Sequence, residues 1–218
     1  MQQIRVAGCA LNQTPLDWDG NRDRIVAAIA AARDAGVAVL CLPELCITGY
    51  GCEDAFQSSG VQRQALEMLA EIAPTTRGIA VAVGLPLRFE SGLFDAAAFV
   101  VDGRIAGIAC KQNLAGDGIH YEPRWFRPWI RGRRGTVMVG GGAVAIGDLR
   151  FACGGVRVGF EICEDAWVAD RPGAALTARG DIWQVTRAGA EIEKLTANDA
   201  ARRISEPRLV ASAAGLFN

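Results

Sequence analysis

The sequence predicts an α/β protein with a mixed β-sheet, and three observations support this prediction. Short apolar runs suited to buried strands alternate with stretches of helical periodicity from residue 4 to residue 87. The next apolar runs flank Asp102-Gly103, a dipeptide typical of a two-residue hairpin turn between antiparallel strands. The 218 residues, 50% of them apolar and 22% charged, can bury one sizeable core, which favours a single domain.

The first strand and the first helix follow from an apolar run and the periodic stretch after it. Residues 4–11 are expected to form a buried strand, which the polar stretch from Asn12 to Gly20 closes. Asn21 is a suitable N-cap for the next helix, and Gly36 is a suitable C-terminal stop. Four apolar residues between them share one helical face: Ile25, Ala28, Ile29 and Ala32.

A second strand, a second helix and a third strand come next. Val37 to Leu42 is too short for a helix and rich in valine and leucine, which indicates a strand buried on both faces. Gln62 to Ala73 has apolar residues at helical spacing, and Ile79 to Leu87 returns to a strand pattern. This β-α-β-α-β order predicts a layered α/β sheet.

Two predicted hairpins argue against a purely parallel sheet. The first turn is Asp102-Gly103, and the second is the glycine cluster Gly140-Gly141-Gly142, which lacks the lysine of a phosphate-binding loop. The runs paired around these turns are Leu93 to Val101 with Arg104 to Ala109, and Thr136 to Val139 with Ala143 to Ile146. Phe151 and the run from Val156 to Phe160 add further strand before Cys163.

Charge and cysteine content bear on the kind of partner and on the compartment. The 23 basic and 24 acidic residues nearly cancel, so we expect no nucleic acid or membrane partner and instead a small molecule. The seven cysteines contain no C-x-x-C pair, which predicts neither a disulfide framework nor a metal site. Met1 leads into the first strand without a signal-peptide pattern, and no apolar run reaches the about 20 residues of a membrane span, so a cytoplasmic location is expected.

Three polar residues stand where apolar strands end, and these positions are where α/β proteins place reacting groups. Glu44 follows the strand that ends at Pro43, Lys111 follows the strand that ends at Cys110, and Cys163 follows Ile162. Their position makes all three candidates for a functional site.

Lys111 and Glu44 each have a functional and an ordinary interpretation. The chain has 21 arginines but only two lysines, Lys111 and Lys194, and a compact ammonium suits a single developing oxyanion better than a planar guanidinium. The ordinary alternative is a lysine that reaches solvent from a strand end. Glu44 has apolar neighbours that would raise its pKa toward the range of a proton carrier, although it could equally cap or pair after Pro43.

Cys163 is distinguished by a tight strand exit rather than by its residue type. Cysteine usually packs as a small buried hydrophobe. A sharp turn at Cys163 would instead expose the sulfur and aim the next backbone N–H at an attacked carbonyl. Glu164 and Asp165 follow it and would raise the pKa of the thiol, so a positive partner is needed, and Lys111 could supply it.

The histidine count separates two kinds of mechanism. A histidine base would have to be His120, since the chain contains one histidine. A structural or substrate-lining role for His120 is at least as good an interpretation, so a Cys163–His120 pair remains a minor alternative to a glutamate base.

Three motifs in this order resemble the nitrilase superfamily and, more narrowly, the N-terminal glutaminase domain of glutamine-dependent NAD synthetases. The motifs are Pro43-Glu44-Leu45 leading to Gly49-Tyr50-Gly51, Lys111 leading to Tyr121-Glu122-Pro123-Arg124-Trp125-Phe126, and Gly159-Phe160-Glu161-Ile162-Cys163-Glu164-Asp165-Ala166-Trp167. Their order and spacing match over residues 4–180.

This resemblance implies a fold, a mechanism and a site. The fold is a four-layer α-β-β-α sandwich that associates into oligomers through its helices. Glu44, Lys111 and Cys163 are implied as the catalytic set of a carbon-nitrogen hydrolase that forms a cysteine thioester. Glu122 is implied as a second carboxylate of the site, Glu164 as a contact for the substrate amino group, and Tyr50 as a residue lining the pocket. The expected substrate is glutamine, and no metal or organic cofactor takes part.

The resemblance ends before the chain does, and three hypotheses follow. Residues 1–182 are expected to form the carbon-nitrogen hydrolase domain and residues 183–218 a divergent or truncated tail, which lacks the serine-rich loop of the family. ATP would be needed only in a synthetase domain, whose phosphate-binding loop this sequence lacks. The chain is then a glutaminase module that feeds ammonia to a synthetase partner or domain, a free-standing amidase or nitrilase, or a non-catalytic remnant.

Overall fold

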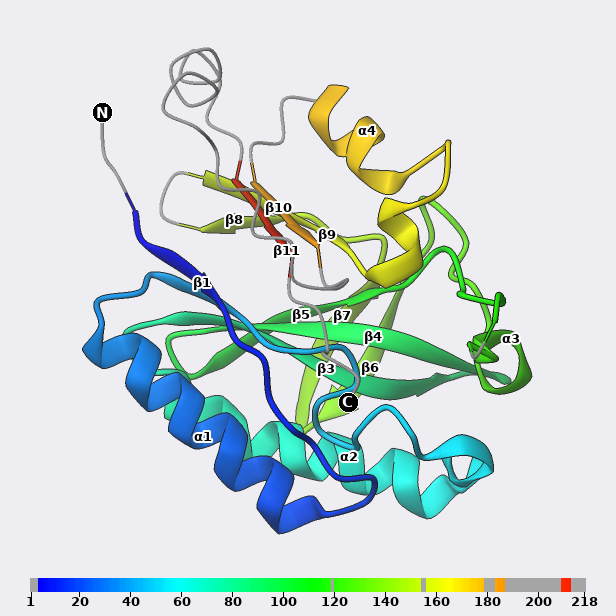
Figure 1. The fold of residues 1–218 in the computed structure, drawn as a ribbon, viewed down its shortest axis with the longest axis horizontal. Helices are drawn as coiled ribbons and strands as arrows, with labels where there is room; N and C mark the ends of the chain where they lie inside the picture. Colours follow the sequence, from blue (N-terminus) through cyan, green and yellow to red (C-terminus); the bar gives the residue numbers. More distant parts are fainter. Residues whose placement is uncertain (1–3, 119, 154–155, 179–182, 187–208, 213–218) are drawn as a thin grey trace.

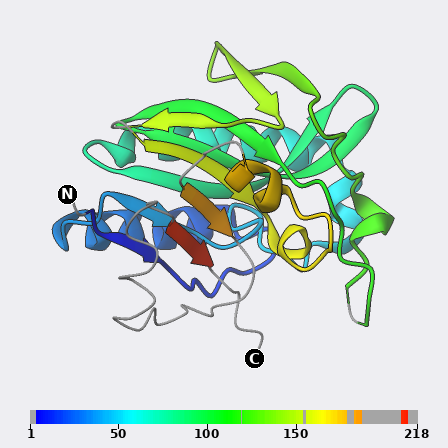
Figure 2. The ribbon, with the colours of Figure 1, turned by 90° about the horizontal axis from the view of Figure 1, so that it is seen from above.

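Four layers of secondary structure make up the protein (Figure 1). The computed structural model describes residues 4–118, 120–153, 156–178, 183–186 and 209–212. Two helices cover one face of a large sheet, a smaller sheet packs on its other face, and a further helix covers the smaller sheet (Figures 1 and 2). The predicted α-β-β-α sandwich is therefore confirmed.

The large sheet has seven strands and mixed pairing. Its order is β1-β2-β3-β4-β5-β7-β6. The first three strands pair in parallel, β3, β4 and β5 form antiparallel pairs, β5 pairs in parallel with β7, and β6 and β7 form a hairpin. The strands are β1 (Val6–Gly8), β2 (Val39–Cys41), β3 (Ala80–Phe89), β4 (Gly92–Val101), β5 (Arg104–Cys110), β6 (Arg134–Val139) and β7 (Gly142–Gly147).

The second sheet has four strands in the order β11-β10-β9-β8. It consists of β8 (Phe151–Cys153), β9 (Val156–Glu161), β10 (Trp183–Thr186) and β11 (Leu209–Ser212). Only the β8–β9 pair is antiparallel among these described strands. Residues 183–218, which we expected to be a divergent tail, lie mostly outside the described residues, but β10 and β11 extend this sheet.

The helices complete the outer layers. They are α1 (Trp18–Asp34), α2 (Ser59–Ile72), α3 (Glu122–Trp125) and α4 (Pro172–Ala178), with 3₁₀ turns η1 (Glu53–Gln57), η2 (Ala73–Thr76) and η3 (Cys163–Ala166). The described helices include none that is long and apolar enough to cross a bilayer.

Alternation along the strands separates two hydrophobic cores. On β3, Val81 and Val83 face the core shared with α1 and α2, whereas Ala80 and Ala82 face the second sheet. The core between the sheets joins small side chains to an aromatic group centred on Phe99, whose ring centroid lies 5.1 Å from that of Phe151 and 5.7 Å from that of Phe160. Both faces of the large sheet are therefore buried, as the apolar run from Val37 to Leu42 predicted.

The two predicted hairpin turns are confirmed by their backbone angles. Asp102 and Gly103 have φ values of 49° and 82°, and Gly140 and Gly141 have φ values of 56° and 80°. Positive φ at both central residues is the requirement of the turn whose twist matches paired strands.

The predicted start of the first helix was wrong. Helix α1 is capped by Asp17, whose carboxylate accepts a hydrogen bond from the Gly20 backbone N–H at 3.2 Å. Asn21 lies inside the helix and is fully buried, where it bonds the backbone of Thr14 and the carbonyl of Ile47. Asp17 and Asn21 are both good caps, and the tertiary contacts of Asn21 decide between them. Strand β1 is also shorter than predicted, and α4 was not predicted.

Truncation of Phe99 tests the packing between the sheets. We expect Phe99→Ala to lower the free energy of unfolding by about 3–5 kcal/mol, because the aromatic group would lose its centre. Met138→Ala is the control, since Met138 is an exposed strand residue, and its effect should stay within about 0.5 kcal/mol. Urea unfolding followed by circular dichroism measures both, and equal losses would contradict this account of the core.

Candidate active site

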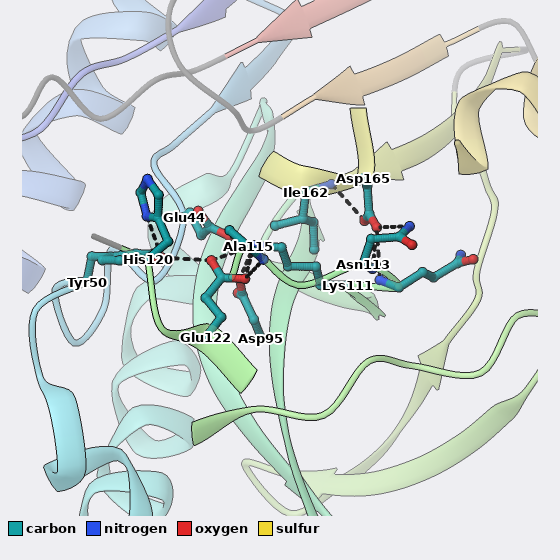
Figure 3. A network of polar contacts seen from close by, with 11 residues as sticks. Glu44, Tyr50, Asp95, Lys111, Asn113, Ala115, His120, Glu122, Ile162 and Asp165 are labelled. Atoms are coloured by element: carbon teal, nitrogen blue, oxygen red, sulfur yellow. Dashed lines mark hydrogen bonds and ion pairs between the residues drawn. The ribbon is translucent and has the colours of Figure 1, made fainter. Parts of the chain in front are cut away.

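Glu44, Lys111 and Cys163 come together at one end of the two sheets. Glu44 follows β2, Lys111 follows β5 and Cys163 follows β9, so each is placed by the exit of a strand. Oxygen atoms of Glu44 and Glu122 and the sulfur of Cys163 all lie within 4.8 Å of one another. The three residues predicted from strand ends thus belong to one cluster. Glu122 and Tyr50 also belong to it, and Figure 3 shows these two residues with Glu44 and Lys111.

The ammonium group of Lys111 lies at the centre of this cluster. The side chain is completely buried, and Nζ lies 2.7 Å from Glu44 Oε1, 2.7 Å from Glu122 Oε2 and 3.5 Å from Asp95 Oδ2. Burial alone would lower the pKa of Lys111, but the negative charges around it, Glu44 first among them, outweigh burial and hold the pKa well above its ordinary value. Lys111 is therefore a charged residue at neutral pH, and its surface alternative is excluded.

Glu122 is the most completely bonded carboxylate of the cluster. Both its oxygens accept from Lys111 Nζ at 2.7 Å, and they also accept from the Tyr50 hydroxyl at 2.7 Å and from the Ala115 backbone N–H at 2.8 Å. Such donors stabilise the ionised carboxylate and fix its position. Glu122 in turn holds Lys111 in place.

Glu44 combines an ion pair with some access to solvent. Its side chain is 11% exposed, whereas those of Lys111, Glu122 and Asp95 are at most 1% exposed. The apolar residues predicted to surround it, Leu42 and Leu45, are fully buried. Among the charged groups around Lys111, Glu44 is thus the carboxylate that a substrate or a water molecule could reach.

Cys163 occupies a strained turn directly after the second sheet. Its φ is +48°, a conformation that residues other than glycine rarely adopt, and it begins the 3₁₀ turn η3. Strain of this kind aims a side chain out of the strand direction, which agrees with the predicted sharp exit.

The charges that act on the Cys163 thiol come from other parts of the chain. Burial raises its pKa first, and the carboxylate of Glu44 raises it further, while Lys111 lowers it as predicted. Glu122 and Asp95 also raise the pKa. These groups, rather than the sequence neighbours Glu164 and Asp165 that we expected to raise the pKa, have the largest effects on it. A raised pKa means that the thiol needs a base at the moment it reacts.

Asp165 connects the cysteine turn to the lysine strand, a role that the sequence analysis missed. Its Oδ1 accepts from the backbone N–H groups of Gln112 and Asn113 at 3.1 and 2.7 Å and from Asn113 Nδ2 at 2.9 Å, and its Oδ2 accepts from Ile162 N at 3.0 Å. Burial raises the pKa of Asp165 to about 6, although these donors lower it. The carboxylate thus remains largely ionised at pH 7 and ties the residues after Lys111 to the residue before Cys163 (Figure 3).

His120 contacts Tyr50. The Tyr50 hydroxyl lies 3.4 Å from His120 Nδ1 and 2.7 Å from Glu122 Oε1, and the two rings meet edge to face. Glu164 is half-buried in η3, beside Cys163 in the sequence. Glu44 lies in the same group of donor atoms as the Cys163 thiol. The choice of Glu44 over His120 as the base and the substrate contact of Glu164 stay predictions.

A thiol and two carboxylates could together bind a cation. Glu44, Glu122 and Cys163 have donor atoms within 4.8 Å of one another. The Lys111 ammonium already lies 2.7 Å from both of these carboxylates, where it takes the place of a metal ion. The arrangement combines a thiol, a reachable carboxylate and a fixed positive charge, which are groups that acyl transfer can use.

Comparison with known proteins identifies a family and relatives that match most of the chain. The profile of the carbon-nitrogen hydrolase family matches residues 5–199. The glutamine-dependent NAD(+) synthetase of Rattus norvegicus is 34% identical over 182 residues, which are 78% of this chain and 25% of that protein. The Saccharomyces cerevisiae protein of the same name is 34% identical over 190 residues, or 81% of this chain and 26% of that protein. The chain therefore spans about a quarter of the length of these relatives.

Solved structures with a similar fold also include a glutamine-dependent NAD(+) synthetase. A glutamine-dependent NAD(+) synthetase from Cytophaga hutchinsonii superimposes with a TM-score of 0.82 and 36% identity, covering 99% of this chain and 36% of that one. An amidase from Nesterenkonia sp. has a TM-score of 0.70 and 23% identity, covering 99% of this chain and 77% of that one. The second similarity concerns the fold alone.

Removal of the Asp165 carboxylate tests whether it connects the backbone after Lys111 to the backbone before Cys163. Asp165→Ala leaves the buried N–H of Ile162 and the part-buried N–H groups of Gln112 and Asn113 without their acceptor, and an unsatisfied buried group costs about 1–3 kcal/mol. We expect a loss of about 3 kcal/mol or more in the free energy of unfolding. Asp54→Ala is the matched control, because the exposed Asp54 pairs with Arg124 at the surface and should contribute about 1 kcal/mol or less. Similar losses in urea unfolding would contradict this role.

Proposed function

Because this chain belongs to the carbon-nitrogen hydrolase family, we propose that it hydrolyses the side-chain amide of glutamine through a thioester on Cys163. The observation that carries the proposal is the Lys111 ammonium, held 2.7 Å from both Glu44 and Glu122 in the cluster that contains the Cys163 thiol. Glutamine is supported by the names of the relatives, which are glutamine-dependent NAD(+) synthetases.

The first half of the reaction forms the thioester. Glu44 takes the proton of the Cys163 thiol as the sulfur attacks the carbonyl carbon of the amide. Lys111 and the backbone N–H of Glu164 stabilise the negative oxygen of the tetrahedral intermediate. The carbon–nitrogen bond then breaks, Glu44 returns its proton to the departing nitrogen, and ammonia leaves.

The second half uses the same groups in reverse. Glu44 is again ionised and takes a proton from a water molecule that attacks the thioester carbonyl. The tetrahedral intermediate collapses, the carbon–sulfur bond breaks, and the proton on Glu44 returns to the sulfur. Glutamate is released and the thiol is restored, without a step that uses a metal or an organic cofactor.

The surrounding residues have positioning and binding roles in this proposal. Glu122 holds the lysine through both its oxygens, and Tyr50 fixes Glu122 and lines the approach to it. Glu164 would contact the substrate amino group.

Ammonia would pass to a synthetase domain or subunit, because the chain spans about a quarter of the synthetases that it resembles. We also propose that the chain forms homo-oligomers through its helices and acts in the cytoplasm.

A second candidate function is a free-standing amidase or nitrilase. The observation in its favour is the fold, since the Nesterenkonia amidase superimposes with a TM-score of 0.70. The third hypothesis, a non-catalytic remnant, is less well supported, because Lys111 lies within hydrogen-bonding distance of both Glu44 and Glu122.

Replacement of the nucleophile distinguishes these functions. We expect the protein to release ammonia from glutamine faster than from other short amides, and Cys163→Ala to reduce the release to background. Cys153→Ala, which changes another half-buried cysteine, should leave it unchanged. Preference for another amide would favour the amidase, no release from any amide would favour the remnant, and activity in Cys163→Ala would contradict the proposed nucleophile.

Replacement of Glu44 tests the single proton carrier. Glu44→Gln should impair both halves of the reaction, and any thioester that still forms should persist because no base activates water. Mass spectrometry of the intact protein after substrate removal would detect it as an acyl group on Cys163. Glu90→Gln, a change at an exposed glutamate that pairs with Arg133, is the control and should turn over normally. Normal turnover by Glu44→Gln together with an inactive His120→Ala would instead identify His120 as the base.

A further inference from the structure

Asp95 is a buried carboxyl group of the site that the proposed mechanism does not use. It lies on β4 opposite Lys111, whose backbone N–H donates to the Asp95 carbonyl at 2.9 Å. Its side chain is completely buried, and its nearest approach to Lys111 Nζ is 3.5 Å. In the described part of the chain, neither carboxyl oxygen accepts a hydrogen bond. A buried carboxylate without donors would be costly, so its protonation state needs an explanation.

The charges around Lys111 do not balance if every carboxyl group is ionised. One ammonium faces Glu44, Glu122 and Asp95, which would leave two uncompensated negative charges in a space with little solvent. Carboxylates this close in a low-dielectric site cannot all ionise, so the cluster retains a proton.

The contacts of the three carboxyl groups indicate which one holds that proton. Glu122 accepts from Lys111, Tyr50 and Ala115, and Glu44 lies 2.7 Å from Lys111, so the ionised forms of both are stabilised. Asp95 has only the longer 3.5 Å approach to Lys111 and no solvent access. Burial, and after it the charge of Glu44, raises the pKa of Asp95 well above its ordinary value.

The carboxyl groups of Glu44 and Asp95 face the same ammonium group, since Lys111 Nζ lies 2.7 Å from Glu44 Oε1 and 3.5 Å from Asp95 Oδ2. Two ionised carboxylates can only repel each other there, whereas a protonated one can donate to an ionised one. We propose that Asp95 is a positioning residue that holds a proton at neutral pH and donates a hydrogen bond through it to the Glu44 carboxylate.

This inference rests on the proposed function. In that reaction the hydrogen bond would have two effects. It orients Glu44 toward the thiol, and it stabilises the ionised form that must accept the proton of Cys163. The proton of Asp95 stays on Asp95 throughout, so Glu44 remains the proton carrier. The titratable groups that act on Asp95 or share its cluster are Glu44, Tyr50, Cys110, Lys111, Glu122 and Cys163.

Infrared spectroscopy tests whether Asp95 is protonated, and this measurement does not depend on enzymatic activity. The difference spectrum of the wild type minus Asp95→Asn at pH 7 should contain the carbonyl band of a protonated carboxyl group. Asp54→Asn, which alters an exposed carboxylate, should instead remove a carboxylate band. A carboxylate band in the Asp95 spectrum would overturn the proposal. A failure of Asp95→Asn to fold would also overturn it, because the amide replaces a neutral acid of nearly the same shape.

The kinetics of two variants test the hydrogen bond. Asp95→Asn should retain kcat within about tenfold of the wild type, because the amide that it introduces keeps an N–H donor toward Glu44. Asp95→Ala removes the donor, so the acid limb of the kcat/KM profile should move to higher pH as Glu44 becomes easier to protonate. Equal profiles for the two variants would overturn the positioning role. If the wild type hydrolyses no amide, the proposed function fails, but the infrared result still decides where the proton lies.

Discussion

The buried ammonium of Lys111 is the charge on which the organisation of the site depends. Three carboxyl groups from three parts of the chain converge on it, and the two nearest, Glu44 and Glu122, could not be enclosed as carboxylates without a positive partner. The ammonium is equally dependent on them, because burial alone would favour its neutral form. The cluster is therefore stable only as a unit, and the loss of the lysine would leave several buried charges without compensation.

The two sheets bring these groups together at the ends of their strands. The large sheet supplies Glu44 after β2, Asp95 within β4 and Lys111 after β5, while the second sheet supplies Cys163 after β9. Asp165 connects the two sheets at this end, since its carboxylate bonds the backbone after Lys111 and the backbone before Cys163. The aromatic packing around Phe99 holds the sheets together elsewhere. The distance between the Cys163 thiol and the Lys111 ammonium thus depends on the packing of the layers, and the proposed acyl transfer requires this distance to be fixed.

The sequence predicted those features that depend on local patterns. Strand ends identified Glu44, Lys111 and Cys163, and the dipeptide Asp102-Gly103 identified a hairpin, because alternation and turn chemistry leave a direct trace in the sequence. The roles of Asp95 and Asp165 depend on contacts between distant segments, which leave little local trace. An aspartate within the apolar run from Leu93 to Val101 was a signal for Asp95, since such a residue is rarely buried without a function. The predicted start of the first helix was wrong for a similar reason, because the buried Asn21 side chain donates a hydrogen bond to the carbonyl of the distant Ile47.

The central claim is that Lys111 carries a positive charge inside the site, and nitrogen NMR measures this directly. The chain has only two lysines, so ¹⁵N-lysine labelling of the Lys194→Arg variant leaves one side-chain signal, that of Lys111. We expect a nitrogen that bears three protons at pH 7 and keeps them as the pH rises toward the ordinary lysine pKa of about 10.4. A neutral amine at pH 7, or a titration below that ordinary value, would contradict the account.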